Sequence, residues 1–340
     1  MPTPRTHGLT LGKFAPLHRG HQYLIETALS EVDALTVVIY DSPEVTDVPL
    51  PVRAGWIRTL YPGVEVIEAW DGPSAMGDTP EIKRLQEDYI LKRLKIRGIT
   101  HFYSSEFYGE HMSRALGAAN RLVDCDRERM PISGTLVRAD PYAARAWLHP
   151  LVYRDLVTNV VFVGAPSTGK TTLAERMARD LNTTWMPEYG REYWDAHQVD
   201  RRLTEAQLVE LAEEHLRRED AALLGANRVL FTDTNAITTY LFSLHYHGRA
   251  DSRLEALARQ AQARYDLVFL CGAEIPYDDT WDRSGDADRQ VFQKQITADL
   301  AARGTPFVTL TGGVDERAAR VKAVLAKHRK WRSLADALLG

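Results

Sequence analysis

The sequence predicts an α/β protein in which two parallel sheets follow one another along the chain. Its 340 residues exceed the roughly 250–300 residues that one hydrophobic core serves, so two domains are expected. Short apolar runs alternate with helix-like patterns in two successive series, which is typical of βαβ units. A turn suited to phosphate follows the first strand of each series. We therefore predict domains at residues 1–155 and 156–340.

The predicted elements fall into two groups. The strands of the first group are 9–14, 35–40, 64–69 and 100–104, with helices at 22–30 and 81–95. The strands of the second group are 158–163, 229–232, 267–271 and 307–310, with helices at 205–224 and 291–303. Pro141, Pro150 and a polar turn before Asn159 separate the groups and indicate a junction near residue 155.

Composition and charge argue against several classes of function. A net charge of -4 disfavours nucleic-acid binding, because phosphate contacts need clustered Lys and Arg. Cys125 and Cys271 follow no metal-ligand spacing and form no disulfide framework, which is typical of a reducing cytosol. No run approaches the roughly 18 apolar residues of a membrane span, and no signal-peptide core follows the first residues. We expect a cytoplasmic protein that spans no membrane.

The first candidate site is the turn after the first predicted strand, GKFAPLHRGH at residues 12–21. Free backbone N–H groups and the helix macrodipole both favour an anion at such a helix N-terminus. Gly12 and Gly20 let the backbone approach a ligand closely. His18 and His21 can both donate hydrogen bonds to a polyphosphate as charge develops on it. Taken singly, a histidine in a turn is more often a solvated or capping residue.

A second segment, ISGTLVR at residues 132–138, fits the pattern I-S-x-T-x-x-R. With the first turn, it resembles the HxGH nucleotidyltransferase superfamily, which implies a Rossmann-like fold for the first domain. Ser133 and Thr135 would cap a helix that meets the triphosphate, and Arg138 would hold the β- and γ-phosphates. On its own, the S-G-T run would be an ordinary helix start.

The superfamily resemblance implies in-line attack of a substrate phosphate on the α-phosphate of ATP, which releases pyrophosphate without a covalent intermediate. The residues expected to carry this step are His18, His21, Lys13 and Arg138. The expected ATP-binding residues are Gly12, Phe14, His18, His21, Ser133, Thr135 and Arg138. Related enzymes hold the adenosine or the acceptor at the end of the fourth strand, where this sequence has Ser104, Ser105 and Glu106.

The second candidate site is a P-loop. Residues 164–171, GAPSTGKT, fit G-x-x-x-x-G-K-[ST] between an apolar run and a helix that begins near Thr172. Lys170 would reach the β- and γ-phosphates of ATP, and Thr171 would ligate Mg²⁺. Asp233 ends an apolar run, where it can act on the metal or cap the next helix. The expected ATP-binding residues here are Gly164, Ala165, Pro166, Ser167, Thr168, Gly169, Lys170, Thr171 and Thr172.

Residues 187–194, PEYGREYW, are a candidate acceptor site because acids and an arginine stand among aromatic rings. A hydroxyl acceptor needs a base, and a flat cationic ring is held by stacking and cation–π contact. Glu188 is the candidate base and Asp233 its competitor, whereas Tyr193 and Trp194 fit a core role equally well. The expected substrate-binding residues here are Glu188, Tyr189, Arg191, Glu192 and Asp233.

A polar segment at 281–289 stands where small P-loop kinases carry a lid. Arg283 and Arg289 would close on the transferring phosphoryl group. An ordinary solvated loop is the competing interpretation.

Both sites, with the runs EYGRE at 188–192 and FTDTNAITT at 231–239, resemble the NadR family over essentially the whole chain. Its members are bifunctional. A ribosylnicotinamide kinase makes nicotinamide mononucleotide, and an adenylyltransferase converts that product into NAD. The resemblance implies nicotinamide riboside, nicotinamide mononucleotide, ATP and NAD as small-molecule partners. ATP is expected as co-substrate at both sites, and the phosphate chemistry predicts Mg²⁺ at both.

The sequence departs from that family in three places. Some members carry an N-terminal helix-turn-helix, whereas the first predicted strand here begins within the first dozen residues, so no repressor function is expected. Asn235 stands where some members have a second aspartate, which leaves the metal-side chemistry to Asp233. Lys13 occupies a position that varies in the superfamily.

Two alternatives stay open. One is a phosphopantetheine adenylyltransferase fused to a dephospho-coenzyme A kinase, which needs no aromatic pocket for a pyridinium. The other is a non-catalytic nucleotide sensor, which would not need His18, His21, Lys170 and Thr171 intact. Exposed helical faces such as 205–224 also suit a homo-oligomer.

Overall fold

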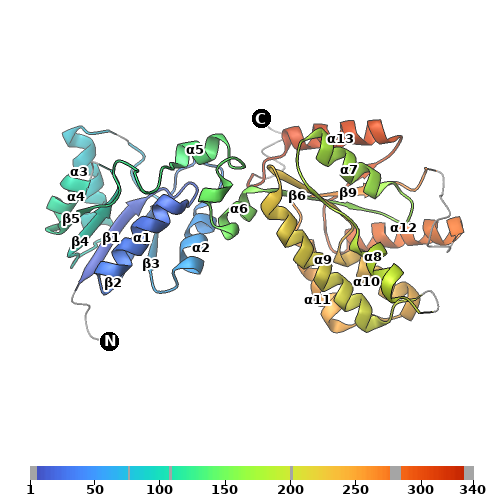
Figure 1. The fold of residues 1–340 in the computed structure, drawn as a ribbon. Helices are drawn as coiled ribbons and strands as arrows, with labels where there is room; N and C mark the ends of the chain where they lie inside the picture. The colour runs from blue at the N-terminus through green and yellow to red at the C-terminus, as the bar shows by residue number, and fades with distance from the viewer. Residues whose placement is uncertain (1–5, 76, 107–108, 200–201, 276–284, 333–340) are drawn as a thin grey trace. The chain divides into compact units, whose positions relative to one another are not determined.

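The computed structural model describes residues 6–75, 77–106, 109–199, 202–275 and 285–332. The chain divides into two compact units, Met1–Tyr153 and Arg154–Gly340. Each unit contains one five-stranded parallel sheet with helices packed on it (Figure 1). The predicted α/β class with two parallel sheets is therefore confirmed. No helix in the described ranges is both long and apolar enough to cross a membrane.

The first unit has β1 at the centre of its sheet, whose strand order is β3-β2-β1-β4-β5. The strands are β1 (His7–Gly12), β2 (Ala34–Tyr40), β3 (Glu65–Ala69), β4 (His101–Ser104) and β5 (Ala119–Leu122). The helices are α1 (Arg19–Glu31), α2 (Leu50–Leu60), α3 (Pro80–Asp88), a π-helix (Tyr89–Arg93), α4 (Gly109–Leu116) and α5 (Gly134–Ala139). A 3₁₀ turn (Arg145–Trp147) and α6 (Pro150–Leu156) follow. The strand order reverses at β1, where parallel sheets bind ligands at the carboxyl edge.

The second unit has β6 at the centre of its sheet, in the order β10-β9-β6-β8-β7. The strands are β6 (Thr158–Val163), β7 (Trp185–Met186), β8 (Val229–Asp233), β9 (Leu267–Cys271) and β10 (Val308–Leu310). The helices are α7 (Lys170–Asp180), α8 (Tyr189–His197), α9 (Glu205–Gly225), α10 (Ala236–His247), α11 (Ser252–Gln262), α12 (Gly285–Ala302) and α13 (Val314–Lys327). Here too the order reverses beside the central strand.

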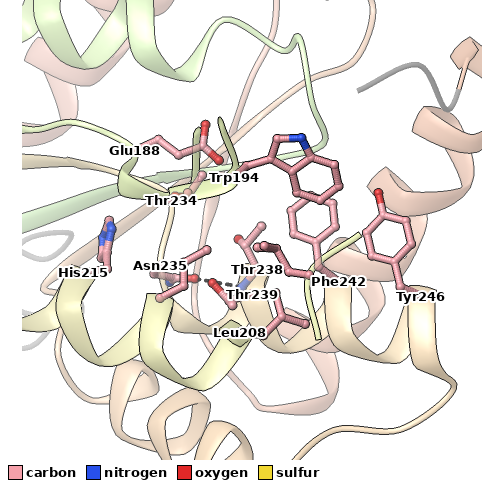
Figure 2. A pocket seen from close by; sticks show the side chains of 13 residues that line it. Glu188, Trp194, Leu208, His215, Thr234, Asn235, Thr238, Thr239, Phe242 and Tyr246 are labelled. Carbon is pink, nitrogen blue, oxygen red and sulfur yellow. Dashed lines mark hydrogen bonds between the residues drawn. The ribbon is translucent and has the colours of Figure 1, made fainter. Parts of the chain in front are cut away.

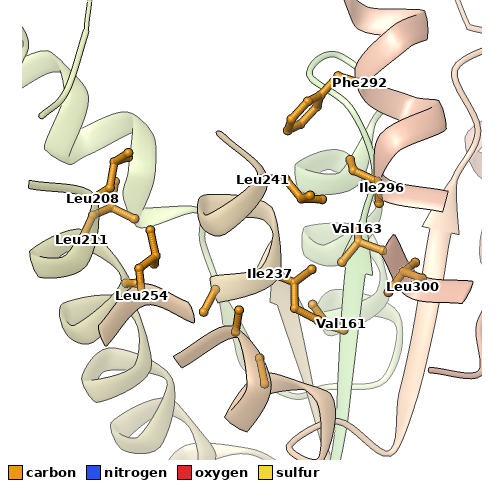
Figure 3. Close-up of a cluster of buried hydrophobic side chains, with 14 of the residues drawn as sticks. Val161, Val163, Leu208, Leu211, Ile237, Leu241, Leu254, Phe292, Ile296 and Leu300 are labelled. Atoms are coloured by element: carbon orange, nitrogen blue, oxygen red, sulfur yellow. The ribbon is translucent and has the colours of Figure 1, made fainter. Parts of the chain in front are cut away.

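The central strand β6 is covered by apolar side chains on both faces of the second sheet. Val161 and Val163 pack into a cluster with the helices α9 to α12, as Figure 3 shows. Val160 and Phe162 pack into a second cluster, which includes residues of α7 and α13. Because side chains alternate along a strand, a strand covered on both faces is a continuous apolar run, as the sequence had indicated.

Several predicted boundaries were wrong. The strand predicted at 9–14 ends at Gly12, because Phe14 has a positive φ of 45° that no strand residue adopts. Helix α7 begins at Lys170 rather than near Thr172, because Gly169 is its left-handed N-cap. Strand β5 had been overlooked because all four of its residues are exposed and it is an edge strand without an apolar pattern.

We expect Leu254→Ala to lower the free energy of unfolding of the second unit by about 2–5 kcal/mol, the usual result of truncating a buried leucine. Leu254 is fully buried in the cluster that Figure 3 shows. Denaturant unfolding of the full chain measures the change. Leu224→Ala, at a leucine that is 39% exposed, is the matched control and should change stability by no more than about 0.5 kcal/mol. Equal losses in both variants would contradict this core assignment.

Candidate active sites

The turn between β1 and α1 brings two imidazoles together. His18 is the N-cap of α1, and its ring stacks on that of His21 with centroids 3.7 Å apart. The backbone N–H of His18 donates to Nδ1 of His21 at 3.4 Å. Nδ1 of His18 is itself buried and finds no hydrogen-bond partner among the described residues. Both rings therefore lie at the helix N-terminus, where an anion is favoured.

The environment keeps both rings neutral at pH 7. Burial, with the charges of Arg127 and Arg138, lowers the pKa of His18 from 6.5 to about 4. Burial and the neighbouring His18 hold the pKa of His21 well below its usual range. A neutral imidazole still donates one hydrogen bond, and an incoming polyanion would favour its protonation.

The second motif lies directly against the first. Ser133 caps α5 by accepting from the backbone N–H of Leu136 at 3.2 Å. Arg138 donates from Nη1 to the carbonyl oxygen of Ala15 at 2.6 Å, and from Nη2 to Thr135 Oγ1 at 3.1 Å. A Cβ added at Gly134 would lie 3.2 Å from that same carbonyl oxygen, so glycine allows this close approach. The structure thus joins residues that are over 100 positions apart.

The other predicted residues of this unit lie around the same edge of the sheet. The Nζ of Lys13 pairs with Glu44 Oε1 at 2.8 Å. Ser104 is the last residue of β4, after Tyr103, which pairs with Thr10 of β1, so residues 105–106 leave the sheet at its carboxyl edge. The Ser104 hydroxyl is buried and donates to the carbonyl oxygen of Glu106 at 3.1 Å.

Sequence reasoning overlooked two arginines of this unit. Arg127 has a positive φ of 53° in the loop after β5, and its charge lowers the pKa of both histidines. Arg53 of α2 is fully buried and donates to the carbonyl oxygens of Lys13 at 2.5 Å and Tyr40 at 3.0 Å. Arg53 therefore holds the ends of β1 and β2 in place beneath the turn.

The P-loop of the second unit has the backbone that its glycines predict. Gly164 and Gly169 have positive φ values of 147° and 78°. A Cβ at Gly164 would lie 2.8 Å from the Cys271 carbonyl oxygen, so a larger residue would displace β9. The ammonium of Lys170 is buried and donates to the Ala165 carbonyl oxygen at 2.9 Å. The loop lines an open cleft.

Asp233 is fully buried at the carboxyl end of β8, next to Thr234 and bonded to Thr171, both of which line this cleft. Its Oδ2 accepts from the hydroxyl of Thr171 at 2.5 Å, and its Oδ1 is buried without a partner among the described residues. Burial, followed by the neighbouring Glu188 carboxylate, raises the pKa of Asp233 to about 7. A hydroxyl and a carboxylate oxygen are thus paired at the mouth of the P-loop.

Arg317 of α13, which the sequence did not single out, hydrogen-bonds the backbone of the P-loop. Its guanidinium is buried and donates to the carbonyl oxygens of Thr168 at 2.7 Å and Gly272 at 3.1 Å. It also pairs with Glu274 Oε1 at 2.7 Å. One side chain therefore ties the P-loop to the loop that follows β9.

A second, smaller cavity adjoins the P-loop cleft (Figure 2). Glu188, Thr234, Thr238 and Phe242 line both spaces, so the cavity and the cleft share a wall. The rings of Trp194, Phe242 and Tyr246 line one end of the cavity, and His215 lies at the other, as Figure 2 shows.

The structure separates the residues of the predicted acceptor segment. Arg191 lines the P-loop cleft, and Trp194 lines the cavity. Tyr189 instead lies under the guanidinium of Arg218, 3.9 Å from ring centroid to Cζ, and Glu192 pairs with that arginine at 2.8 Å. Tyr193 is buried and donates to Glu210.

Only one of the two arginines of the predicted lid lies in the part of the chain that the structure describes. Arg289 is buried in α12 and donates from Nη2 to the carbonyl oxygens of Ala273 at 2.6 Å and Ile275 at 2.7 Å. Arg283 lies outside the described residues.

Known proteins resemble this chain in its second unit and over most of its length. A family model described as an AAA domain matches residues 159–317. The Trifunctional NAD biosynthesis/regulator protein NadR of Escherichia coli (strain K12) is 30% identical over 327 residues, which cover 89% of this chain and 78% of that protein. The chain belongs to the NadR family. The NadR protein of Salmonella typhimurium (strain LT2) is also 30% identical, over 329 residues that cover 88% of this chain and 78% of that protein.

Solved NadR structures share the fold. A NadR protein in complex with NAD and AMP-PNP has a TM-score of 0.57 and 23% identity, over 94% of this chain and 95% of that one. A NadR protein in complex with NR gives the same TM-score, identity and coverage. At this identity the likeness concerns the fold, so NadR membership rests on the sequence relatives.

We expect the first unit to lose stability as the pH falls from 6.5 towards 4, because an unfolded histidine takes up a proton in this range and His18 does not. The loss should approach roughly 3 kcal/mol, since each pKa unit is about 1.4 kcal/mol. His18→Asn keeps a good N-cap and should flatten this dependence. Denaturant unfolding across this range, with hydrogen exchange in α1, measures it. His245→Asn, at an exposed histidine of the other unit, should leave it unchanged. Equal slopes in His18→Asn and the parent chain would contradict the burial argument.

Proposed function

We propose that this chain joins two ATP-dependent reactions of pyridine-nucleotide synthesis. The unit that begins at Arg154 phosphorylates nicotinamide riboside to nicotinamide mononucleotide. The unit that ends at Tyr153 transfers AMP from ATP to nicotinamide mononucleotide, giving NAD and pyrophosphate. The observation that carries the proposal is the aromatic cavity that adjoins the P-loop cleft at Glu188. The NadR proteins solved with NR and with NAD and AMP-PNP support the choice of substrates.

In the proposed kinase reaction, the P-loop and Lys170 hold the β- and γ-phosphates of ATP. The described residues contain no cluster of three or more His, Cys, Asp or Glu that would form a protein-only metal site. The unpartnered Oδ1 of Asp233 and the hydroxyl of Thr171 fit Mg²⁺, which usually takes few protein ligands together with phosphates and waters. When bound, Mg²⁺ neutralises charge on the transferring phosphates.

Glu188 is the proposed base. Asp233 is bonded to Thr171 and assigned to the metal side, whereas Glu188 lies on the wall that the cleft and the cavity share. A carboxylate there can accept the proton of the attacking hydroxyl while that oxygen faces the γ-phosphate. Arg191, which lines the cleft, supplies positive charge towards the transferring group.

The aromatic end of the cavity suits the pyridinium ring. A flat cation gains cation–π attraction over aromatic faces, and the gain increases where water is excluded. Trp194 and Tyr246 come from different helices, and Phe242 lies one α10 turn before Tyr246. Dephospho-coenzyme A, the kinase acceptor in the coenzyme A alternative, carries no flat cation, so the aromatic end of this cavity favours the pyridine substrate.

In the proposed adenylyl transfer, the triphosphate of ATP lies at the N-termini of α1 and α5. His18, His21 and Arg138 then donate hydrogen bonds to oxygens on which charge develops as pyrophosphate leaves. Ser133 and Thr135 orient α5, and Lys13, which pairs with Glu44, adds positive charge near the turn. No proton needs to leave the attacking phosphate, so positioning is the main requirement.

The proposal predicts that purified protein with ATP and Mg²⁺ converts nicotinamide riboside into nicotinamide mononucleotide, and the mononucleotide into NAD. Chromatography of the products measures both steps. Adenylylation of phosphopantetheine, with no reaction of either pyridine substrate, would overturn the acceptor assignment.

Single substitutions separate the two sites within this experiment. Lys170→Ala should lower kinase turnover at least 100-fold and leave adenylyl transfer intact, because the lysine lies in the other unit. His18→Ala should do the reverse. Loss of both activities in either variant would contradict independent sites.

Metal binding at the kinase site should release a proton. Burial and the neighbouring Glu188 carboxylate raise the pKa of Asp233 and so favour its protonated form, whereas Mg²⁺ requires the ionised form. Calorimetry of Mg²⁺ with AMP-PNP in buffers of different ionisation enthalpy measures the release, which should fall as the pH rises above 7. Asp233→Asn removes the titrating group and should abolish this release, whereas Asp220→Asn, at an exposed aspartate on α9, should preserve it. Equal release in the parent chain and in Asp233→Asn would contradict the assignment.

A further inference from the structure

Helix α12 places one amide side chain between the P-loop and strand β9. The backbone pairing of β6 with β9 ends at Val163 and Leu270. Just beyond it, Oε1 of Gln293 accepts from the backbone N–H of Ala165 at 2.8 Å, and Nε2 donates to the carbonyl oxygen of Cys271 at 3.0 Å. An N–H only donates and a carbonyl oxygen only accepts, so these partners fix which way the amide points. Gln293 therefore bridges the P-loop and β9 where the pairing of the strands ends.

Both backbone groups that Gln293 binds belong to fully buried residues, Ala165 and Cys271. A buried N–H or carbonyl oxygen that loses its partner is destabilising, because water cannot replace the bond. Gln293 lines neither the P-loop cleft nor the acceptor cavity. Any effect of this side chain on a ligand must therefore pass through the backbone that it holds.

The carbonyl oxygen of Ala165 is held by the P-loop itself. It accepts from Nζ of Lys170 at 2.9 Å and from Oγ1 of Thr168 at 2.8 Å. In the proposed kinase reaction Lys170 moves to the phosphates of ATP and gives up this bond. Gln293 and Thr168 then still hold Ala165. The bond from Ala165 to Gln293 therefore matters more in the ATP-bound loop than in the free loop.

We propose that Gln293 is a positioning residue for ATP at the kinase site. It keeps Ala165 in place while Lys170 serves the phosphates, so the rest of the loop keeps the shape that binds them. A contact that stabilises the bound loop more than the free loop raises the affinity for the ligand. This inference rests on the proposed function, which assigns Lys170 to the β- and γ-phosphates.

The first test compares the Kd of AMP-PNP with Mg²⁺ in the parent chain and in Gln293→Met, measured by calorimetry. Methionine has a similar length and helix propensity but cannot donate to Cys271. We expect the Kd to rise about tenfold, the scale of a lost hydrogen bond that leaves buried partners unpaired. Gln295→Met, the same change at an exposed position of α12, should change the Kd less than about twofold. Equal Kd values in the parent chain and in Gln293→Met would overturn the positioning role.

Binding of nicotinamide riboside shows whether the effect is confined to ATP. Phe292, the neighbour of Gln293, stacks on Phe242 of the acceptor cavity with ring centroids 4.5 Å apart. A shift of the whole helix would therefore also reach the cavity. The Kd of the riboside should stay within about twofold in Gln293→Met. Equal losses for the riboside and AMP-PNP would overturn the positioning role, whereas a parent chain that binds neither ligand would overturn the kinase proposal itself.

A double-mutant cycle tests the part that Lys170 plays. In Lys170→Ala the carbonyl oxygen of Ala165 has no lysine partner to lose, so Gln293 should matter equally in the free and the bound loop. Gln293→Met should therefore raise the Kd of AMP-PNP less than about twofold in that background, against about tenfold in the parent chain. Titration to millimolar AMP-PNP covers the weaker binding expected without the lysine. The same factor in both backgrounds would overturn the inference and leave the kinase proposal standing.

Discussion

The buried carboxylate of Asp233 is the constraint on which the second unit depends. Strands β6 and β8 pair so that Asp233 lies opposite Phe162. Phe162 is two residues before Gly164, where the P-loop begins. There Asp233 bonds Thr171, the first helical threonine after Lys170, while the charge of Glu188 helps to raise its pKa. A carboxyl group in such a place either pairs with a cation or keeps its proton. Asp233 therefore links Thr171 of the P-loop to Glu188, which lines both the cleft and the cavity.

Features that depend on local sequence were predictable. The P-loop could be predicted because its glycines, lysine and threonine are contiguous and each has a conformational or chemical reason. The strands β6 and β9 matched their predicted ranges because a strand buried on both faces is an unbroken apolar run. The turn around His18 was predicted for the same reason, whereas the fit of Arg138 against Ala15 could only be expected from a resemblance.

Features that depend on tertiary packing were not predictable. Phe242, Tyr246 and His215 lie on helices whose patterns indicate an ordinary core face, and only the approach of α8 encloses them in a cavity. Arg53 and Arg317 donate to backbone carbonyl oxygens. Because every residue has such an oxygen, the sequence does not show which one an arginine will bind. Tyr189 and Glu192 belong to the run that predicted an acceptor site, yet both side chains contact Arg218 instead of lining the cavity.

The two candidate sites both follow the central strand of their sheets, but they offer different groups to a phosphate. At the P-loop, glycines with positive φ shape a backbone cradle, whose N–H groups do not titrate. At the first site, the available donors are imidazole and guanidinium groups, and of these only the imidazoles can change protonation. The pKa values of about 4 for His18 and about 7 for Asp233 keep the two responses apart. Near neutral pH a proton changes charge at the kinase metal position alone, while His18 in the first unit stays neutral.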